Sequence, residues 1–571
     1  MDTYYQKELS VLREDAQAFG RRYPALAPMM QPGSDPDVER ILEGVAYLCG
    51  RIRQRLDQTA PELLQTLLRL TFPHAVLPTP STTPMAFAPR ADVRELLSLR
   101  RGTELASRPV NGVPCLYTLD DDAALLPMQV LNIAFDRHND TTGVLSLHLR
   151  SAIPLAALGS TPLRLHLAAP YAEAVQQYYA LRQGLVSMEI LAGKRSWHLD
   201  ASALKPAVLP AHDRRLAAGR GLARAYMTLH RYFLQPQQLL FFQLHGLNRL
   251  PLPDEAGGYE LRFHLRGEAV RGVTFRDDAF LLNVFPASNI CRVASEPVNI
   301  THMQEEYVLR PQDGVRRSLD ILSVEQATAL FAGGRTEEFT TFENSDPQQD
   351  GGVYQLRCRP SPVSGQPEHL IMPLYRSDKV LSTQPYTLAL RLRCCNTTQP
   401  AQLQVGDICE STDSSPALAT FRNILAPTPT LPRPADESLL WRFVGHINAN
   451  LLSLASPRAL RDLLALYLPP PESAQELFLA NRRRCDAISE FSSVPTERLF
   501  RGRLFRGYEL RLALRREGFT SAGDAYLFCG ALDDLLAEFS LLNNYTQLHA
   551  RLANEYGSWS WTPHLGTRPL I

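Results

Sequence analysis

The spacing of apolar residues changes near Val76, and this change restricts the chain to a helical module followed by a β-rich body. Before it, apolar residues recur every three or four positions, as in a helix that packs along another helix. After it, short alternating runs such as "GVLSLHLRSAI" and "PLRLHLAAP" predict strands. The helical part carries two apolar stripes: Tyr5, Leu9, Leu12, Ala16, Phe19 and Tyr23, and then Val38, Ile41, Val45, Leu48 and Ile52. We therefore expect a multidomain α+β protein.

Start and stop signals divide the helical part into three helices. Pro24 ends the first, and Ser34 or Asp35 caps the second. The third, "PELLQTLLRLTF", lies between Pro61 and Pro73. Short helices are marginal in water, so these must find partners within the chain or between chains. The pattern favours a bundle module, and packing onto the chain's own sheet is the alternative.

Four domains are expected from changes in pattern and from polar or proline-rich segments. They are a helical bundle module (1–75), a β-rich middle region with inserted helices (76–330), a β-rich domain that ends in a proline-rich linker (331–436), and an α+β C-terminal domain (437–571). The middle region reads as sandwich or barrel-like units. "YTLALRLRCCN" at Tyr386–Asn396 is the clearest strand, and the linker "APTPTLPRPADES" predicts an extended, semi-rigid boundary.

The composition excludes several classes of function. Lys plus Arg and Asp plus Glu both number 59, so no overall field attracts nucleic acid, and we expect no nucleic-acid partner. Nine scattered cysteines fit a reducing compartment. The chain shows no signal peptide and no apolar run of about eighteen residues, so we expect a cytoplasmic protein without direct membrane insertion.

Local signatures of catalysis are absent from the sequence, including a nucleophile elbow, a phosphate-binding loop and H-E-x-x-H. Asp120, Asp121 and Asp122 could hold a divalent cation, but aspartates between two strands more often cap a turn. Two sets of side chains could form a ligand set or a nucleophilic relay: His198 with His212 and Asp213, and His446 with Asn450. Without a nucleophile signature, structural histidines are favoured. We therefore assign no catalytic residue, no cofactor and no metal.

A string of aromatic residues could stack bases or sugars, but a domain core is the better interpretation because few basic residues lie among them. The string consists of Tyr226, Tyr232, Phe233, Phe241 and Phe242.

Several phrases resemble the TssF family of the bacterial type VI secretion baseplate, also called ImpG or VasA. The opening block carries most of the resemblance, with "YYQKELSVLREDAQAFGRRYPALAPMM", "DPDVERILEGVAYLCGRIRQRLDQTAPEL" and "FPHAVLPTPS". It continues through "RYFLQPQQLLFFQLHGL", "EEYVLRPQDG" and "LRLRCCNTTQPAQLQVGD" to "GSWSWTPHLGTRPLI" at the end of the chain. The resemblance therefore covers essentially the whole length.

This resemblance implies a scaffold subunit of the baseplate wedge, docked at the cytoplasmic side of the inner-membrane complex. In the family, two TssF copies embrace one TssG, and helices of all three chains form a core bundle. The wedges then join neighbouring wedges around the VgrG spike, attach to TssK and TssE, and support tube and sheath assembly. The expected partner-binding residues are those of the two stripes: Tyr5, Leu9, Leu12, Phe19, Val38, Ile41, Val45, Leu48 and Ile52.

Two alternatives stay open at this point. A cytoplasmic hydrolase or carbohydrate-acting enzyme would have a cleft among the β domains in which acids or histidines converge with shifted pKa values. A β-rich module that binds a peptide or glycan would show an exposed aromatic groove.

Overall fold

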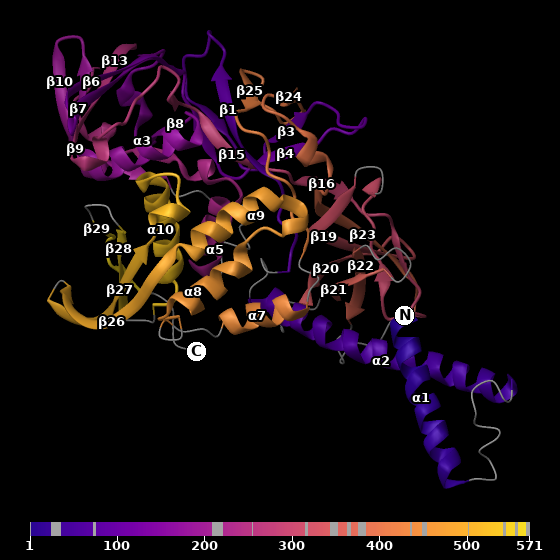
Figure 1. Cartoon of the computed structure of the whole chain (residues 1–571). Coiled ribbons are helices and arrows are strands. Elements are labelled where there is room, and N and C mark those ends of the chain that lie inside the picture. The colour runs from indigo at the N-terminus through magenta and orange to yellow at the C-terminus, as the bar shows by residue number, and fades with distance from the viewer. Residues whose placement is uncertain are drawn as a thin grey trace. The chain divides into compact units, whose positions relative to one another are not determined.

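The structure is a computed structural model that describes residues 2–23, 36–71, 76–207, 221–253, 255–314, 318–342, 352–361, 367–374, 384–433, 437–447, 451, 454–500, 502–540, 544–553 and 558–566. The chain forms two compact units. The first comprises Met1–Val76, Arg359–Pro367 and Pro434–Val444, and the second comprises Leu77–Cys358, Glu368–Arg433 and Gly445–Ile571. The expected α+β class is confirmed, with 30% of residues in helices and 42% in strands (Figure 1).

The first unit is built on two long helices, α1 (Asp2–Arg22) and α2 (Pro36–Thr71). It also holds most of α7 (Glu437–Ile447). The expectation of a separate third helix is wrong, because α2 continues through Pro61 without a break. A proline inside a helix removes one intrahelical hydrogen bond, but the leucine-rich residues that follow Pro61 are strong helix formers and sustain the helix.

A six-stranded sheet begins the second unit and combines distant parts of the chain. Its spatial order is β24 (Ile408–Ser411), β3 (Glu104–Ser107), β4 (Leu116–Leu119), β15 (Val284–Ser288), β1 (Thr82–Pro89) and β25 (Ala419–Asn423). Met85, Phe87, Tyr117, Phe285 and Phe421 are part of one buried cluster from these strands. A two-stranded ribbon of β2 (Leu97–Leu99) and β5 (Ala123–Leu125) adds to this region.

Two further antiparallel sheets follow. The five-stranded sheet has the order β10 (Arg195–Asp200), β9 (Leu185–Ala192), β13 (Gly257–Arg266), β7 (Thr142–Ser151) and β6 (Met128–Asn139). The four-stranded sheet has the order β11 (Leu204–Pro206), β12 (Phe241–Leu244), β8 (Leu163–Leu167) and β14 (Phe280–Leu281). The inserted helices expected from the sequence correspond to α3 (Tyr171–Gly184) and α5 (Gly221–Leu234).

The largest sheet has eight strands. Its order is β16 (Cys291–Ala294), β23 (Tyr386–Asn396), β19 (Leu319–Phe331), β20 (Thr336–Thr341), β21 (Gly352–Pro360), β22 (Pro367–Leu374) and β18 (Tyr307–Val308), and β17 (Val298–Ile300) also pairs with β23. The strand expected at Tyr386–Asn396 is confirmed as β23. The domain limit expected after residue 330 lies inside β19, so a division there would cut a strand that pairs along its length with β23.

The neighbouring thiols of Cys394 and Cys395 lie on opposite faces of β23, as alternation along a strand requires. Cys394 belongs to the main core cluster of the sheet, whereas Cys395 packs with Ile290 and Leu322. All nine cysteines are free thiols.

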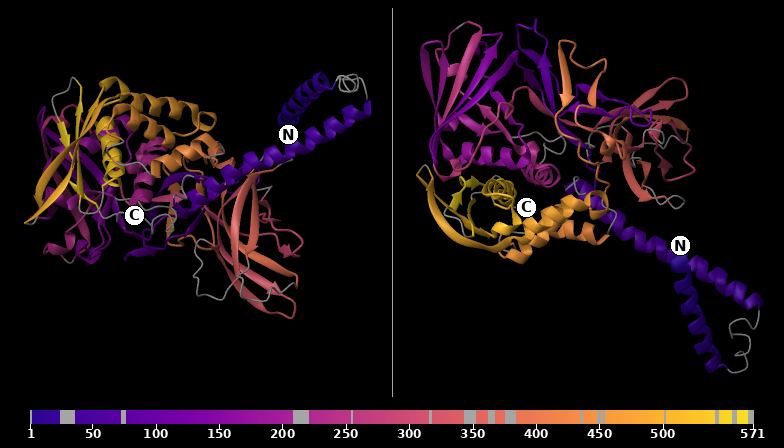
Figure 2. Two further views of the ribbon diagram at one scale, coloured as in Figure 1. Left: turned by 90° about the horizontal axis from the view of Figure 1, so that it is seen from below. Right: turned by 45° about the horizontal axis from the view of Figure 1, so that its top comes forward.

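The C-terminal part contains a mixed sheet and three helices. Its strands are β26 (Ile488–Phe500), β27 (Arg503–Leu514), β28 (Asn544–Leu552), β29 (Ser558–Ser560) and β30 (His564–Leu565). Its helices are α8 (Pro457–Leu464), α9 (Pro471–Asp486) and α10 (Ala522–Ala537). The apolar helix α10 packs against α3 and α5, so this part shares a core with the middle of the chain. Figure 2 shows these elements from two further directions.

The proline-rich segment pairs with residues in and near β1 where the structure describes it, up to residue 433, and a limit between the two units falls between Arg433 and Pro434. The amide of Thr428 donates to the carbonyl of Thr82, and Leu431 forms a bridge with Thr79. Thr428 and Leu431 are buried. Prolines leave few donors to satisfy, so an extended proline-rich strand can lie along the β1 segment with the remaining groups paired.

Candidate partner-binding site on the N-terminal helices

One crossing holds α1 against α2 through small and apolar side chains. Leu9 and Ala16 of α1 are buried, and Ala46 of α2 is fully buried. A β carbon on Gly50 would lie 3.2 Å from the amide nitrogen of Tyr5. Gly50 therefore allows the backbone of α1 to approach α2 closely.

Two ion pairs flank this crossing and set the direction of the helices. Arg13 pairs with Glu39, and Glu8 pairs with Arg53. Because the later residue of α1 meets the earlier residue of α2, the two helices run antiparallel. Figures 1 and 2 show that they separate toward the end of α1.

The second stripe lies on a different face of α2 from the one that α1 covers. Ile41, Leu48 and Ile52 are 66%, 60% and 61% exposed, and Val45 is 40% exposed. Residues three and four apart share one face of a helix, so these four side chains form a continuous apolar stripe. We call Ile41, Val45, Leu48 and Ile52 the α2 stripe.

The first stripe is used largely within the chain. Leu9 is buried, and Tyr5 and Leu12 are half-buried, as expected for the side of α1 that meets α2. Phe19 is exposed near the end of α1, where its ring lies 4.7 Å from that of Tyr23. The side chain of Val38 lies outside the described structure. The structure thus separates the expected site into an inward part on α1 and an open part on α2.

The crossing depends on Ala46 and Gly50, which the apolar spacing in the sequence does not predict. They are small residues four positions apart, and therefore on one helix face. A search for apolar residues passes over such a pair. Small residues at helical spacing would have been the signal, because they allow two helix backbones to approach.

The acidic cluster forms a structured turn, as the sequence favoured. Asp120 is buried with its Oδ2 3.6 Å from a guanidinium nitrogen of Arg231. Burial raises the pKa of Asp120 to about 6, and the charge of Arg231 opposes that rise. The Oδ1 of Asp122 accepts a hydrogen bond from the amide of Arg101 at 2.8 Å. Among the described residues, no group of His, Cys, Asp or Glu is arranged to hold a metal ion.

Of the candidate histidines, only His198 has a side chain within the described structure. Nδ1 of His198 lies 3.3 Å from Oε1 of Glu189 on the five-stranded sheet. His212, Asp213 and Asn450 lie outside the described residues, as does the side chain of His446. The aromatic string is buried, which confirms the prediction of a domain core.

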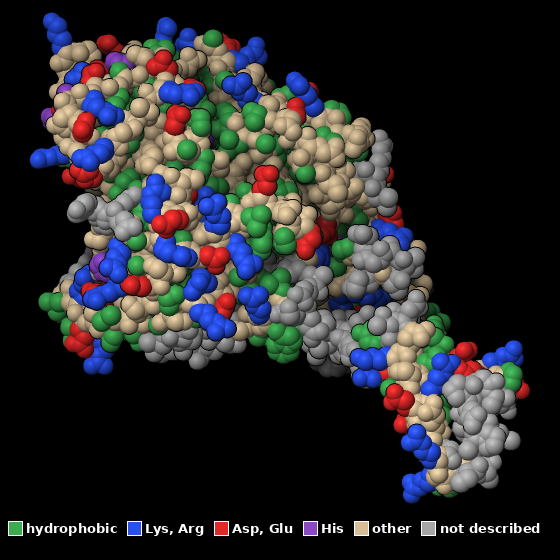
Figure 3. Space-filling view, viewed as in Figure 1, with side chains coloured by type: hydrophobic (Ala, Val, Ile, Leu, Met, Phe, Trp, Pro, Cys, Tyr) green, Lys and Arg blue, Asp and Glu red, His purple; other side chains and the backbone are tan. Residues whose placement is uncertain are grey.

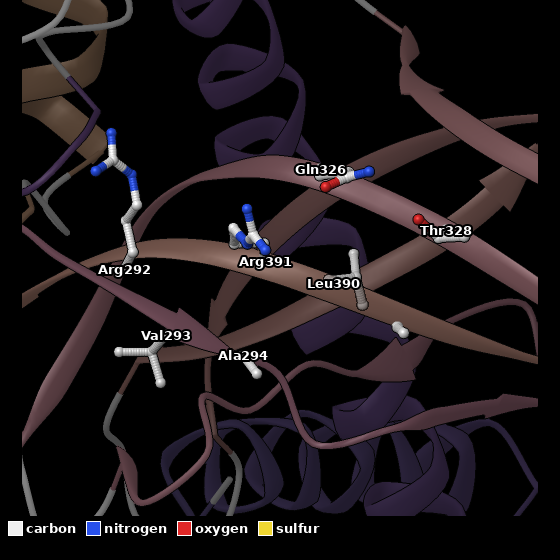
Figure 4. A pocket seen from close by; sticks show the side chains of 8 residues that line it. Arg292, Val293, Ala294, Gln326, Thr328, Leu390 and Arg391 are labelled. Atoms are coloured by element: carbon white, nitrogen blue, oxygen red, sulfur yellow. The ribbon is translucent and has the colours of Figure 1, made fainter.

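Two hollows bear on the enzyme alternative. A trough of about 400 Å³ lies on the eight-stranded sheet, and its lining includes Arg292, Gln326 and Arg391 (Figure 4). Its described lining offers no carboxylate or imidazole for proton transfer.

The second hollow is a cavity of about 260 Å³ lined by residues of α3, α5, α10 and the C-terminal strands. There Nε2 of His564 lies 2.7 Å from Oδ2 of Asp533. Burial raises the pKa of Asp533, and the hydrogen bond from His564 opposes the rise. No serine or cysteine is among the described residues of its lining. The pair links β30 to α10, which is a sufficient structural role.

The surface agrees with the neutral composition. On the face shown in Figure 3, basic and acidic side chains alternate without a broad patch of one sign. None of the helices that the structure describes is long and apolar enough to cross a membrane.

Comparison with known proteins identifies the family. Residues 1–568 match the family described as "Type VI secretion system, TssF". The chain belongs to this family. The type VI secretion system component TssF1 of Pseudomonas aeruginosa is 25% identical over 628 aligned positions, which cover 99% of this chain and 98% of that protein.

Solved structures agree with the family assignment. A chain of the TssK-TssF-TssG baseplate subcomplex, determined by cryo-electron microscopy, matches with a TM-score of 0.75 and 25% identity, covering 93% of this chain and 99% of that one. A chain of the type VI secretion baseplate complex shares the fold, with a TM-score of 0.65 at 22% identity over 100% of both chains. TssF is a component of this baseplate.

Proposed function

We propose that this TssF chain is a non-catalytic scaffold subunit of the baseplate wedge and that the α2 stripe is its main site for binding partner helices. The observation that carries the proposal is the exposure of Ile41, Leu48 and Ile52 at 60% or more on one face of a long helix. Covering each of these side chains would contribute about 1–2 kcal/mol. A partner helix with the same spacing would complete the packing.

The partners follow from the family. TssK and TssG are named in the subcomplex that contains the similar chain. For this chain we infer binding to one TssG together with a second copy of itself, and contacts with TssK, TssE, the VgrG spike and neighbouring wedges. We place the assembly in the cytoplasm, docked on the inner-membrane complex.

The absence of catalysis is part of the proposal. Its support is that the candidate acidic and aromatic residues have structural roles: Asp120 pairs with Arg231 inside the fold, and the aromatic string is buried. Steady turnover of a substrate by the purified assembly would contradict it.

The test is co-purification with TssG from the same source cells. The triple variant Ile41→Gln, Val45→Gln and Leu48→Gln keeps good helix formers but removes the apolar stripe. The expected result is at least about a hundredfold weaker binding of TssG, because three apolar side chains that the complex would bury are lost. The second unit should keep its thermal unfolding midpoint.

Tyr47→Gln provides the matched control, because Tyr47 is also exposed on α2 but does not belong to the stripe. This variant should bind TssG as the wild type does. Wild-type binding by the triple variant would show that the α2 stripe is not the site.

A further inference from the structure

The hairpin of β26 and β27 extends beyond the sheet that supports it. The two strands pair from Ile488 with Leu514 to Phe500 with Arg503. Their neighbour β28 pairs with β27 only from Arg506 onward. Among the described residues, the last part of the hairpin is therefore a two-stranded ribbon, which is visible as the long curved pair of strands in Figure 1. We call residues 497–500 and 503–506 the hairpin tip.

Two leucines face each other on one side of this tip. Leu499 is directly opposite Leu504, and the two are 68% and 63% exposed. Single exposed leucines are common on protein surfaces. A directly opposed pair on this ribbon is different, because no strand among the described residues pairs alongside Leu499 or Leu504.

The other side of the ribbon is fixed in place by Tyr545 of β28. The hydroxyls of Thr496 and Tyr545 are hydrogen-bonded, and Arg498 lies with its guanidinium carbon 5.7 Å from the ring centre. A β carbon on Gly507 would lie 2.3 Å from the ring, so only glycine leaves room for it. Directly opposed pairs alternate between the two faces of a β-ribbon. Thr496 and Arg498 lie on the face that contacts Tyr545, so Leu499 and Leu504 lie on the opposite, exposed face.

The tip is also basic. It carries Arg498, Arg503 and Arg506 against a single acid, Glu497, whose Oε1 is 3.1 Å from Nε of Arg506. The sequence there repeats as "RLFRG" and "RLFRG", so both strands present an arginine followed by a leucine. By the strand register, Arg506 and Glu497 share the face of the two leucines, whereas Arg498 and Arg503 belong to the opposite face. The tip as a whole therefore carries a net positive charge in a chain whose formal charge is zero.

We propose that the hairpin tip inserts into an apolar groove with an acidic rim on a baseplate subunit other than TssG and other than a second copy of this chain. This inference rests on the proposed function and adds a second contact, separate from the α2 stripe. Charge complementarity favours an acidic rim, and arginine beside apolar side chains is typical of protein interfaces. The trough of Figure 4 on a second copy of this chain is a poorer fit for the tip, because its described lining contains Arg292 and Arg391 and no acidic side chain.

The same side chains disfavour other classes of partner. Two leucines bury fewer carbons than a single myristoyl chain, which by itself binds membranes only marginally. Nucleic-acid sites usually offer exposed aromatic rings on which bases stack. The exposed pair at the tip is leucine, and Phe505 belongs to the opposite face, which Tyr545 anchors.

The first test is photo-cross-linking in the assembled baseplate. Benzoylphenylalanine replaces Leu504 in the full chain, and the cross-linked residues are identified by mass spectrometry. The expected product joins position 504 to an apolar surface flanked by Asp or Glu on a baseplate subunit other than TssG. A product with a second copy of this chain, with lipid or with nucleic acid, or no product above that of the same probe at Leu131, would overturn the proposal.

The second test compares variants by the mass of the particle purified from the source cells. Leu499→Ser with Leu504→Ser, or Arg503→Glu alone, should leave the TssG complex intact and weaken the larger assembly by about tenfold or more. Leu131→Ser, a change at a leucine that is 59% exposed elsewhere, serves as the control and should assemble normally.

The two proposals fail in different ways. If the tip variants give the full particle, the tip proposal is wrong while the α2 stripe still stands. If the α2 triple variant binds TssG normally, the proposed function of the stripe is wrong, whatever the cross-link at position 504 shows.

Discussion

Gly50 lies directly beneath the backbone of Tyr5, where a β carbon would come within 3.2 Å of the Tyr5 nitrogen. The three nearest atoms at that point belong to the backbone of Tyr4 and Tyr5, which cannot move aside as a flexible side chain can. Gly50→Leu should therefore force α1 away from α2 and weaken TssG binding, because the α2 stripe would lose its support. Helical content and binding can be followed by circular dichroism and co-purification.

Gly44 is the matched control in the same helix. A β carbon on Gly44 would meet nothing within 4 Å. Gly44→Ala should stabilise α2 by about 1 kcal/mol, since alanine is the better helix former. If Gly50→Leu and Gly44→Ala bind TssG equally well, the close approach of α1 is not needed for the site.

Cys49 reports on the occupancy of the α2 stripe. It is half-buried one helical turn from Val45, whereas the thiols of Cys395 and Cys529 are buried and their pKa values are raised by that burial. Protonated, buried thiols react slowly. Alkylation of the free chain should therefore modify Cys49 and Cys409 first, as read by peptide mass spectrometry.

Binding of TssG should then slow the reaction of Cys49 and leave that of Cys409 unchanged, because Cys409 lies in β24. Equal alkylation rates for Cys49 with and without TssG would place the partner elsewhere on the chain.

The sequence predicts those features of the structure that depend on residues close together along the chain. It does not predict features that depend on contacts between distant residues. The α2 stripe could be identified because helical spacing is local. Whether α1 would cover it could not be read from spacing, since Ala46 and Gly50 direct α1 to another face. The hairpin tip was likewise missed, although the tandem "RLFRG" marks it in the sequence.

Long-range pairing sets a second limit. The strand β23 was found from its alternation, but its pairing with β16, about one hundred residues earlier, carries no local signal. For this reason a domain limit was expected at residue 330, inside β19. The packing of the proline-rich segment against Thr82 likewise spans more than three hundred residues and has no local signal.

Two buried aspartates should give opposite pH dependence. Burial raises the pKa of Asp120 to about 6, against the opposing charge of Arg231. Burial would also raise the pKa of Asp320, but the hydrogen bond from His369 and the charge of Arg433 outweigh it, and this pKa lies below its usual value. The unfolded values of both are about 4.

The signs follow from proton binding. Asp120 is protonated in the folded state between pH 4 and 6, so its contribution to the free energy of unfolding falls as pH rises through this range. The contribution of Asp320 is present above pH 4 and is lost as pH falls through its lowered folded pKa. The measurement is the thermal midpoint of the wild type minus that of each variant, Asp120→Asn or Asp320→Asn, at several pH values between 3 and 7. Plotted against pH, the two differences should have slopes of opposite sign. Parallel slopes would contradict the assignments.

The carboxylate of Asp524 joins four helices at one buried point. It accepts hydrogen bonds from the hydroxyls of Tyr171 at 2.6 Å and Tyr232 at 3.1 Å, and it lies 3.3 Å from Arg484. These residues belong to α3, α5 and α9, and Asp524 itself lies in the first turn of α10. Asp524→Ala should destabilise the second unit by about 3–5 kcal/mol, because Arg484 is left as a buried charge without its counterion.

Two further variants test whether the loss of stability comes from the buried charge of Arg484 and not from removing any carboxylate. Asp486→Ala breaks only an exposed pair with Arg482 at 3.9 Å, and should change stability by less than about 0.5 kcal/mol. Replacing both partners, Asp524→Leu with Arg484→Met, should be less damaging than Asp524→Ala alone, since no unpaired charge remains buried. Thermal unfolding of the three variants tests this order. If Asp524→Ala unfolds within 1 °C of the wild type, the carboxylate does not hold the four helices together.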